Sequence, residues 1–326
     1  MTKTEFLDTV DHIIGDKRLF FYGFEVSEER EKLIVNGFID THDSIGLISK
    51  NAEDLILQVK VLEDMIPPAL AFGMVIIPVT DMRKDPRFRT ERIHQLIFGE
   101  FVKVLILENE YALVKDLRTG FIGYIQRSHV IFFSNDAMNE IKRKGSQIVV
   151  SERFSNIEIN DRKTFVPFGT KLFAVESGKF WHAFLPNGYT VKIPSNDVSA
   201  KPVFDDIEKK WSLFLGTPYL WGGASTYGYD CSGYVGRLYD YAGIQIPRDA
   251  DLQQNFSHKI EETELKFGDL IFFPGHVGMY IENGNMVHAN LTQGGVGVSQ
   301  ILNPQNRYEE NLRKSMVKLG RIVGNL

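Results

Sequence analysis

The spacing of hydrophobic and polar residues changes along the chain, and each change predicts a different kind of structure. Residues 1 to about 70 have a mixed, largely helical pattern, with the clearest periodicity in EDLILQVKVLEDMI at 53–66. From about residue 72 the chain turns to short runs rich in β-branched and aromatic residues: MVIIPVT, FVKVLIL, YALVKDL and FIGYIQ. Because Gly, Asn, Asp or Pro bounds each run, the pattern predicts four or five strands that form a small barrel.

A second stretch with the same pattern follows at about 145–200. It contains SQIVVSE, KLFAVES, FWHAFLP and YTVKIPS, while SGKF and PNGY supply residues that suit tight hairpin turns. We therefore predict a second small barrel.

The pattern becomes helical again after residue 203. Apolar residues on one face of this predicted helix are Phe204, Ile207, Trp211, Phe214 and Leu215. Gly216 and Pro218 should end it. The sequence thus predicts an α+β protein with an N-terminal segment, two barrels and a final domain. Their expected bounds are 1–70, 71–140, 141–202 and 203–326.

The composition is typical of a soluble globular protein. Charged residues make up 24% of the 326, and the formal net charge is -5 with both signs interspersed. No basic stripe is present to neutralise phosphates, so we expect no nucleic-acid partner. The amino terminus has a polar or charged residue every few positions, which predicts neither a signal peptide nor a membrane span. We expect a cytoplasmic protein, or an exported one if a leader was removed.

Cys231 is the only cysteine in the sequence, which excludes a disulfide framework and a cysteine-rich zinc site. A glycine-rich loop, GTPYLWGGASTYGYD, leads directly into Cys231 and a predicted helix that Gly243 ends. The apolar face of this helix is Tyr234, Val235, Leu238, Tyr239 and Ala242. Cys231 would lie in the first turn, where the helix dipole and unpaired N–H groups favour a thiolate and can hold an oxyanion.

Two histidines downstream are candidates for the proton acceptor that a cysteine nucleophile needs. His276 opens the alternating run HVGMYI, and His288 lies 12 residues later in MVHAN, after the turn ENGN. Neighbouring strands of such a hairpin can place both rings on one face, with His276 as base and His288 orienting it.

Structural interpretations compete with this one. A lone cysteine is more often a buried thiol, and strand histidines usually belong to the surface or the core. We assign that role to the remaining histidines, His12, His42, His94, His129, His182 and His258. The GG pair fits no nucleotide-binding fingerprint, so we discard a nucleotide site.

The motifs PYLWGG, DCSGYV, IPRDADLQ, GDLIFF, HVGMYI and VHA follow one another in this order. Together they resemble the NlpC-type cysteine peptidases, papain-like enzymes that cut bacterial cell-wall peptides. The resemblance covers about 203–326 and implies Cys231 as nucleophile, His276 as base and His288 as third polar residue. It implies no metal and no cofactor.

The same resemblance implies residues around the nucleophile. Tyr219 would help hold the oxyanion, unless it is a core aromatic beside Trp221. Asp230 and Ser232 match the DCS motif and would bind substrate or backbone. Asp249 would bind a substrate ammonium group, and it can equally serve as the N-cap of ADLQQNF.

The upstream part carries a second resemblance. TERIHQLIFGEFVKVLILENEYALVKDLRTGFIGYIQRSHV is similar to a bacterial SH3-like domain, and Glu100 in it matches a position where that domain reaches the cleft. Exposed glutamates on small barrels are also common. Ala250 departs from the family, in which Ser or Thr is frequent.

Two SH3-like domains before the peptidase resemble the γ-D-glutamyl-L-diamino acid endopeptidases, or dipeptidyl-peptidases VI. This implies hydrolysis of the bond between γ-D-Glu and L-Lys or meso-diaminopimelate in murein peptides with a free N-terminal L-Ala, in cell-wall peptide recycling. Two alternatives stay open: a wall-anchored hydrolase of intact peptidoglycan, or an inactive wall-peptide-binding protein.

Overall fold

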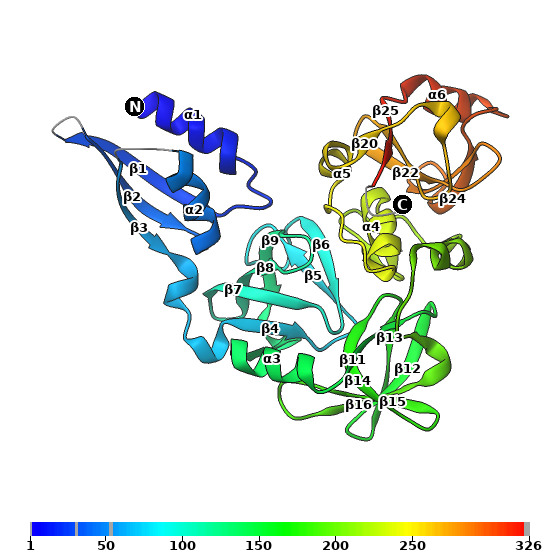
Figure 1. Ribbon diagram of the computed structural model, residues 1–326, viewed down its shortest axis with the longest axis horizontal. Coiled ribbons are helices and arrows are strands. Elements are labelled where there is room, and N and C mark those ends of the chain that lie inside the picture. The colour runs from blue at the N-terminus through cyan, green and yellow to red at the C-terminus, as the bar shows by residue number, and fades with distance from the viewer. Residues whose placement is uncertain (1, 30–31, 52–54, 323–326) are drawn as a thin grey trace.

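Helices and mainly antiparallel sheets follow one another along the chain in this computed structural model, so the protein is of the α+β class (Figure 1). The structure describes residues 2–29, 32–51 and 55–322. Within these residues, successive parts of the chain build separate sheets of three, seven, seven, two and six strands.

The N-terminal part is a three-stranded sheet with two helices packed on it. Helix α1 (Lys3–Ile14) precedes the hairpin of β1 (Tyr22–Glu29) and β2 (Lys32–Ile39), and α2 (His42–Asn51) leads to β3 (Leu55–Val61), which is parallel to β2. The helices and the sheet share one apolar cluster, so this part has a core of its own.

The mixed structure predicted for residues 1–70 is confirmed, but the expectation that it is largely helical is wrong, since three strands lie there. Of the stretch at 53–66, residues 55–61 are strand β3 and Leu62–Met65 is a 3₁₀ helix, whereas 53 and 54 lie outside the described residues. Side chains along β3 alternate between half-buried and exposed, which is the two-residue period of a strand. LILQVKV carries this alternation, but Leu55, Val59, Leu62 and Ile66 are four, three and four residues apart and so also fit the period of a helix.

The first seven-stranded sheet contains the strands that the sequence predicts after residue 72. Short 3₁₀ helices connect to it or interrupt it at Pro68–Leu70 and Arg127–His129. Its antiparallel order is β10-β4-β7-β8-β9-β5-β6. The strands are β4 (Phe72–Val75), β5 (Val79–Arg83), β6 (Arg92–Ile97), β7 (Phe101–Leu107), β8 (Tyr111–Asp116), β9 (Ile122–Gln126) and β10 (Val130–Phe133).

The second seven-stranded sheet follows helix α3 (Asn135–Arg143), with a 3₁₀ helix at Ser195–Asp197. Its order is β13-β12-β16-β15-β14-β11-β17, again antiparallel throughout. The strands are β11 (Ser146–Val150), β12 (Phe154–Ile159), β13 (Arg162–Pro167), β14 (Lys171–Ser177), β15 (Phe180–Phe184), β16 (Thr190–Pro194) and β17 (Val198–Ser199). Among the described residues, the end strands of neither sheet pair with each other.

The helix predicted from residue 204 is in fact two 3₁₀ helices, η5 (Phe204–Lys209) and η6 (Trp211–Phe214). The apolar pairs 204/207 and 211/214 are each three residues apart, which matches the three-residue turn of a 3₁₀ helix. Lys210, with φ -112°, separates the two turns, so the apolar face does not continue as one helix.

The last part of the chain combines a buried helix with a six-stranded antiparallel sheet of order β20-β25-β21-β22-β23-β24. Its helices are α4 (Cys231–Tyr241), α5 (Ala250–Phe256), the 3₁₀ helix Glu262–Glu264 and α6 (Arg307–Ser315). Its strands are β18 (Ala224–Ser225), β19 (Gly228–Tyr229), β20 (His258–Lys259), β21 (Leu270–Phe273), β22 (His276–Tyr280), β23 (Asn285–Asn290), β24 (Gly295–Gln300) and β25 (Lys318–Arg321).

Helix α4 is buried along its whole length, and both seven-stranded sheets send charged side chains to its polar residues. Glu100, between β6 and β7, pairs with Arg237 at 2.7 Å. Lys171, at the start of β14, pairs with Asp240 at 2.7 Å. These buried ion pairs fix the helix that begins at Cys231 against the rest of the molecule.

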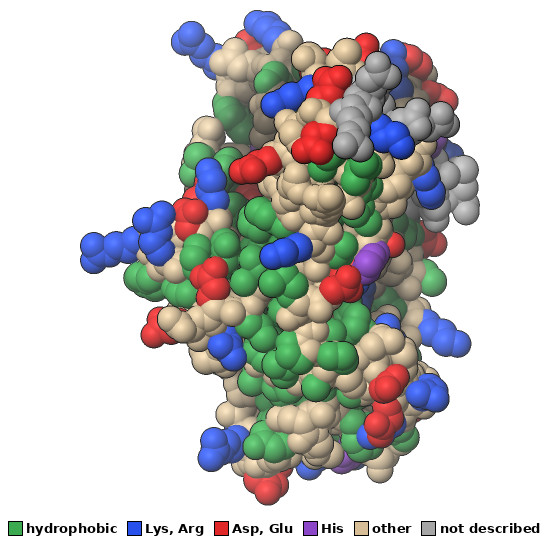
Figure 2. Space-filling view, turned by 90° about the vertical axis from the view of Figure 1, so that its left-hand side faces the viewer, with side chains coloured by type: hydrophobic (Ala, Val, Ile, Leu, Met, Phe, Trp, Pro, Cys, Tyr) green, Lys and Arg blue, Asp and Glu red, His purple; other side chains and the backbone are tan. Residues whose placement is uncertain are grey.

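No helix in the described parts of the chain combines the length and the apolar composition that a span needs. On the face shown in Figure 2, acidic and basic side chains are interspersed around hydrophobic ones, in keeping with the mixed charge along the sequence.

The hairpin of β22 and β23 turns at Asn283 and Gly284, whose φ angles of 52° and 79° are both positive. A Cβ on Gly284 would lie 2.4 Å from Gln300 Oε1, so we expect Gly284→Ala to lower the free energy of unfolding by about 1–2 kcal/mol. Gly46→Ala in α2 is the control, because its Cβ meets open space, and it should stabilise by up to ~1 kcal/mol. Urea unfolding of both variants tests this, and equal midpoints would contradict it.

Candidate active site

Three parts of the chain line a cavity of about 860 Å³, which we call the Cys231 cavity. Residues between 15 and 22 form one wall, and residues of β8, β9 and their surroundings form a second. The last part of the chain contributes the third wall. Five predicted site residues lie there: Tyr219, Asp230, Cys231, Ser232 and Asp249.

Cys231 is the first residue of α4, as predicted from the sequence. Asp230 is the N-cap, and its Oδ1 accepts the backbone N–H of Gly233 at 2.7 Å. The loop before it packs closely, because a Cβ on Gly233 would lie 2.1 Å from the carbonyl oxygen of Gly223. Glycines at 223 and 233 therefore allow the loop to deliver the thiol directly at the helix start.

The prediction that the helix start yields a thiolate is not met in the free protein. Burial raises the pKa of the Cys231 thiol to about 11, and the neighbouring Asp230 carboxylate adds to the rise. Hydrogen bonds from the backbone at Val277 and Ser232 lower that pKa, but they are outweighed. Cys231 is therefore a neutral thiol near pH 7.

The two predicted histidines meet across the β22–β23 hairpin. His276 Nε2 lies 2.7 Å from His288 Nδ1, and His288 Nε2 lies 3.0 Å from Ser299 Oγ. If His276 carries its hydrogen on Nε2 and donates to His288, then His276 Nδ1 is the basic nitrogen. In that arrangement His288 donates in turn to Ser299, a residue of β24 that the sequence analysis did not identify.

Both rings are neutral near pH 7. Burial lowers the pKa of His276 to about 4, and burial together with His276 lowers the pKa of His288 to about 3. The backbone of Val277, the residue after His276, donates a hydrogen bond to the Cys231 thiol, so the strand of His276 lies against the nucleophile. A neutral ring and a neutral thiol are the starting state for general-base activation, in which the proton moves only as the nucleophile attacks.

Asp230 and Ser232 both accept hydrogen bonds from Arg248, a residue that was not predicted from the sequence. Arg248 donates to both Asp230 oxygens at 2.6 and 3.0 Å and to Ser232 Oγ at 2.9 Å. Its Nε donates to His94 Nδ1 at 2.7 Å, and His94 comes from β6. Arg248 stands beside Asp249 in IPRDA and so had a signal in the sequence, whereas His94 lies 154 residues away and had none.

Asp249 begins α5 as its N-cap residue but makes no capping hydrogen bond with its side chain. Its Oδ2 instead accepts from Arg18 at 2.8 Å, and its Oδ1 lies 3.7 Å from Arg248. Burial nevertheless raises the pKa of Asp249, because the loss of hydration outweighs both arginines. This carboxylate can therefore still gain from a cation in the cavity.

The structure places Tyr219 in the cavity, as predicted, but places Glu100 outside it. Burial raises the pKa of Tyr219 to about 12, so its phenol stays protonated in the cavity and can donate a hydrogen bond. Glu100 is not among the cavity's lining residues: its carboxylate pairs with Arg237 at 2.7 Å and Arg118 at 3.1 Å.

Among the described residues, no group of His, Cys, Asp and Glu is arranged to hold a metal ion.

A thiol at a helix start with two linked histidines is the site of a cysteine hydrolase. Residues 216–313 match the model of the NlpC/P60 family. A probable endopeptidase of Haemophilus influenzae is 31% identical over 150 residues, which cover 44% of this chain and 90% of that protein. The chain belongs to the NlpC/P60 family and is a cysteine peptidase.

Longer similarities extend upstream of the family match. Dipeptidyl-peptidase 6 of Lysinibacillus sphaericus is 28% identical over 272 residues, covering 77% of this chain and 99% of that protein. A γ-D-glutamyl-L-lysine dipeptidyl-peptidase of Bacillus cereus is 32% identical, covering 63% of this chain and 66% of that protein. A crystal structure of an NlpC/P60 family protein from Bacillus cereus has the same fold, with a TM-score of 0.68, 21% identity and coverage of 77% and 99%.

The raised pKa of Cys231 predicts how fast the thiol is alkylated at different pH. Only the thiolate reacts, so the rate constant with iodoacetamide should rise about tenfold per pH unit between pH 6 and 9.5. The urea-unfolded protein is the control, since its thiol should titrate near the usual pKa of about 8.5 and level off. Cys231 is the sole cysteine, so the signal has one source. A plateau below pH 7 in the folded protein would mean a preformed ion pair instead.

The buried contacts of Glu100 predict that Glu100→Gln destabilises the protein without changing substrate binding. Removing its charge leaves Arg237 and Arg118 short of a buried partner, which should cost about 3 kcal/mol in the free energy of unfolding. Glu110→Gln, at an exposed glutamate, is the matched control. Chemical unfolding and peptidase assays measure the two effects, and a large rise in KM at unchanged stability would return Glu100 to the substrate site.

Proposed function

We propose that this protein hydrolyses the bond between γ-D-glutamate and a diamino acid in murein peptides that have a free N-terminal L-alanine. The observation that best supports this is the placing of Cys231 and Asp249 in one cavity, with the burial of Asp249 only partly compensated. The names of the L. sphaericus and B. cereus relatives point to the same chemistry.

In the proposed mechanism, His276 takes the thiol proton as Cys231 attacks the γ-glutamyl carbonyl. The backbone N–H groups at the start of α4 and the Tyr219 phenol donate hydrogen bonds to the oxyanion. Protonated His276 then gives its proton to the departing amine, leaving an acyl-enzyme. His276 next deprotonates a water molecule that hydrolyses the thioester, and His288 holds the ring through the 2.7 Å hydrogen bond.

The substrate's ammonium group would bind Asp249 within the Cys231 cavity. Asp230 and Ser232 would act through Arg248, to which both are bonded, more than through direct contact with the peptide. An N-blocked peptide would exclude water from Asp249 without supplying a cation, and covering a carboxylate whose burial the arginines only partly offset costs several kcal/mol.

We also propose that the two seven-stranded sheets are SH3-like domains at 71–140 and 141–202, before a papain-like domain at 203–326. A separate apolar cluster at the centre of the first sheet and another centred on the second support two units. Residues 1–70 would be a further unit. A role in recycling peptides already released from the wall fits a site that demands a free amino terminus.

The proposed function predicts strong discrimination between free and blocked peptides. We expect kcat/KM for L-Ala-γ-D-Glu-L-Lys to exceed that for its N-acetylated form at least about a hundredfold, because each 1.4 kcal/mol is a factor of ten. Asp249→Asn should reduce this ratio to below about tenfold, and Cys231→Ala should abolish cleavage. Mass spectrometry of the products gives the cleaved bond.

Other outcomes of that experiment decide between the functions considered. Equal rates on free and blocked peptides, with release of peptides from intact sacculi, would favour a hydrolase of whole peptidoglycan. Binding without cleavage, unchanged in Cys231→Ala, would indicate a wall-peptide-binding protein.

A further inference from the structure

The segment between α1 and β1, residues 15–21, which we call the connector, forms part of the Cys231 cavity. Gly15, Asp16, Lys17, Arg18, Phe20 and Phe21 all line it. The connector belongs to the N-terminal part, to which the sequence assigns no role. Its place in the wall means that this part faces any ligand that reaches the nucleophile.

All five N–H groups of the Arg18 guanidinium are used by carboxylates. The Nη1 atom donates to Asp249 at 2.8 Å and to Asp251 at 2.9 Å. The Nη2 atom donates to Asp251 at 2.8 Å and to Asp16 at 2.7 Å, and Nε donates to Asp16 at 2.9 Å. Since arginine has five such donors, Arg18 has none left for the carboxylates of a peptide.

Arg18 stands where a substrate cation would stand. Asp249 turns away from its capping position to meet Arg18, and it is the carboxylate that we assign to the substrate's ammonium group. An ammonium group that bound Asp249 beside the guanidinium would lie only a few ångströms from a like charge and would be repelled by it. The substrate and Arg18 therefore compete for Asp249.

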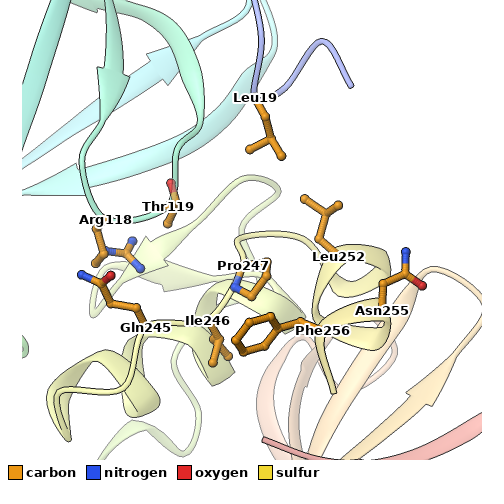
Figure 3. Close-up of a pocket in the computed structure, with 9 residues that line it drawn as sticks. All are labelled: Leu19, Arg118, Thr119, Gln245, Ile246, Pro247, Leu252, Asn255 and Phe256. Carbon is orange, nitrogen blue, oxygen red and sulfur yellow. The ribbon is translucent and has the colours of Figure 1, made fainter. Parts of the chain in front are cut away.

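The connector is built so that the Arg18 side chain can leave while its backbone stays. The carbonyl oxygen of Arg18 accepts the N–H of Ile122 in β9 at 2.8 Å. Next to it, Leu19 points toward Leu252 of α5 at the rim of a neighbouring pocket (Figure 3). The Arg18 side chain is 34% exposed, so it can swing into solvent without unfolding the connector.

We propose that Arg18 is a specificity-determining residue, which holds Asp249 and Asp251 in the empty site and is displaced only by a ligand that brings its own ammonium group. The inference rests on the proposed function, because it takes Asp249 as the amine-binding residue. A blocked peptide carries no cation to replace the guanidinium, so Arg18 remains in place and excludes it. The N-terminal part thus helps to select peptides by their amino terminus.

The test is to compare KM values of Arg18→Gln and the parent protein for free and N-acetylated L-Ala-γ-D-Glu-L-Lys at low salt. Without the internal competitor, we expect KM for the free peptide to fall about tenfold with kcat within about twofold. KM for the acetylated peptide should fall by a larger factor, because Arg18 no longer excludes this peptide, so the ratio of the two KM values should become smaller. A KM for the free peptide that stays the same or rises would overturn the inference, because Arg18 would then only support the fold or Asp249.

Three further variants serve as controls and as a safeguard against misfolding. Lys3→Gln removes an exposed cation of α1 that does not line the cavity, and should change KM less than about threefold. Arg18→Lys keeps the charge and should stay close to the parent. Asp16→Asn removes one of the carboxylates that hold Arg18 and should lower KM in the same direction, about threefold.

A second readout needs no peptide and separates this inference from the proposed function. Cys231 is reacted with a cationic and with a neutral methanethiosulfonate, and the ratio of the two rates is measured. This ratio reports the net negative charge at Asp249 and Asp251 that Arg18 does not neutralise. Arg18→Gln should raise this ratio about tenfold, whereas Lys3→Gln should change it less than about threefold. A raised ratio in a protein that does not cleave the peptide would refute the proposed function alone, whereas an unchanged ratio in an active enzyme would refute the role of Arg18.

Discussion

The buried contact between Arg248 and Asp230 is the interaction on which the site depends. Asp230 caps the helix that begins at Cys231, and Arg248 holds both of its carboxylate oxygens. Arg248 also donates a hydrogen bond to His94 in the first seven-stranded sheet. Burial lowers the pKa of His94 to about 4, so its ring is neutral. A neutral ring can accept the Nε hydrogen of Arg248 without adding a third charge. One arginine thus joins the nucleophile's helix to a sheet formed far earlier in the chain.

The parts of the site that could be predicted from the sequence are those made by neighbours along the chain. The Cys231 helix start depends on DCSG, and the histidine pair depends on one hairpin with an Asn-Gly turn. His94 and Arg18 could not be predicted, because they reach Arg248 and Asp249 across 154 and 231 residues. Such pairs depend on how the separate parts dock, which no local pattern records.

The errors in the fold have local physical causes as well. Strand β3 has its half-buried residues two apart, but the spacing of Leu55, Val59, Leu62 and Ile66 fits a helix equally well. At the nucleophile, the expectation of a thiolate followed the helix dipole, whereas burial has the larger effect on the pKa of Cys231. In both cases the deciding factor is the surroundings of the side chain, which the sequence reveals only indirectly.

The position of β25 links the site to the order in which the chain is synthesised. Residues 318–321 pair with β21, the strand beside the one that opens with His276, so the sheet under the histidines is completed by nearly the last residues described. A ribosome-bound chain that has not yet released β25 presents β21 with an open edge beside β22. The catalytic hairpin therefore gains the support of the whole sheet only after residues 318–321 have left the ribosome and paired with β21.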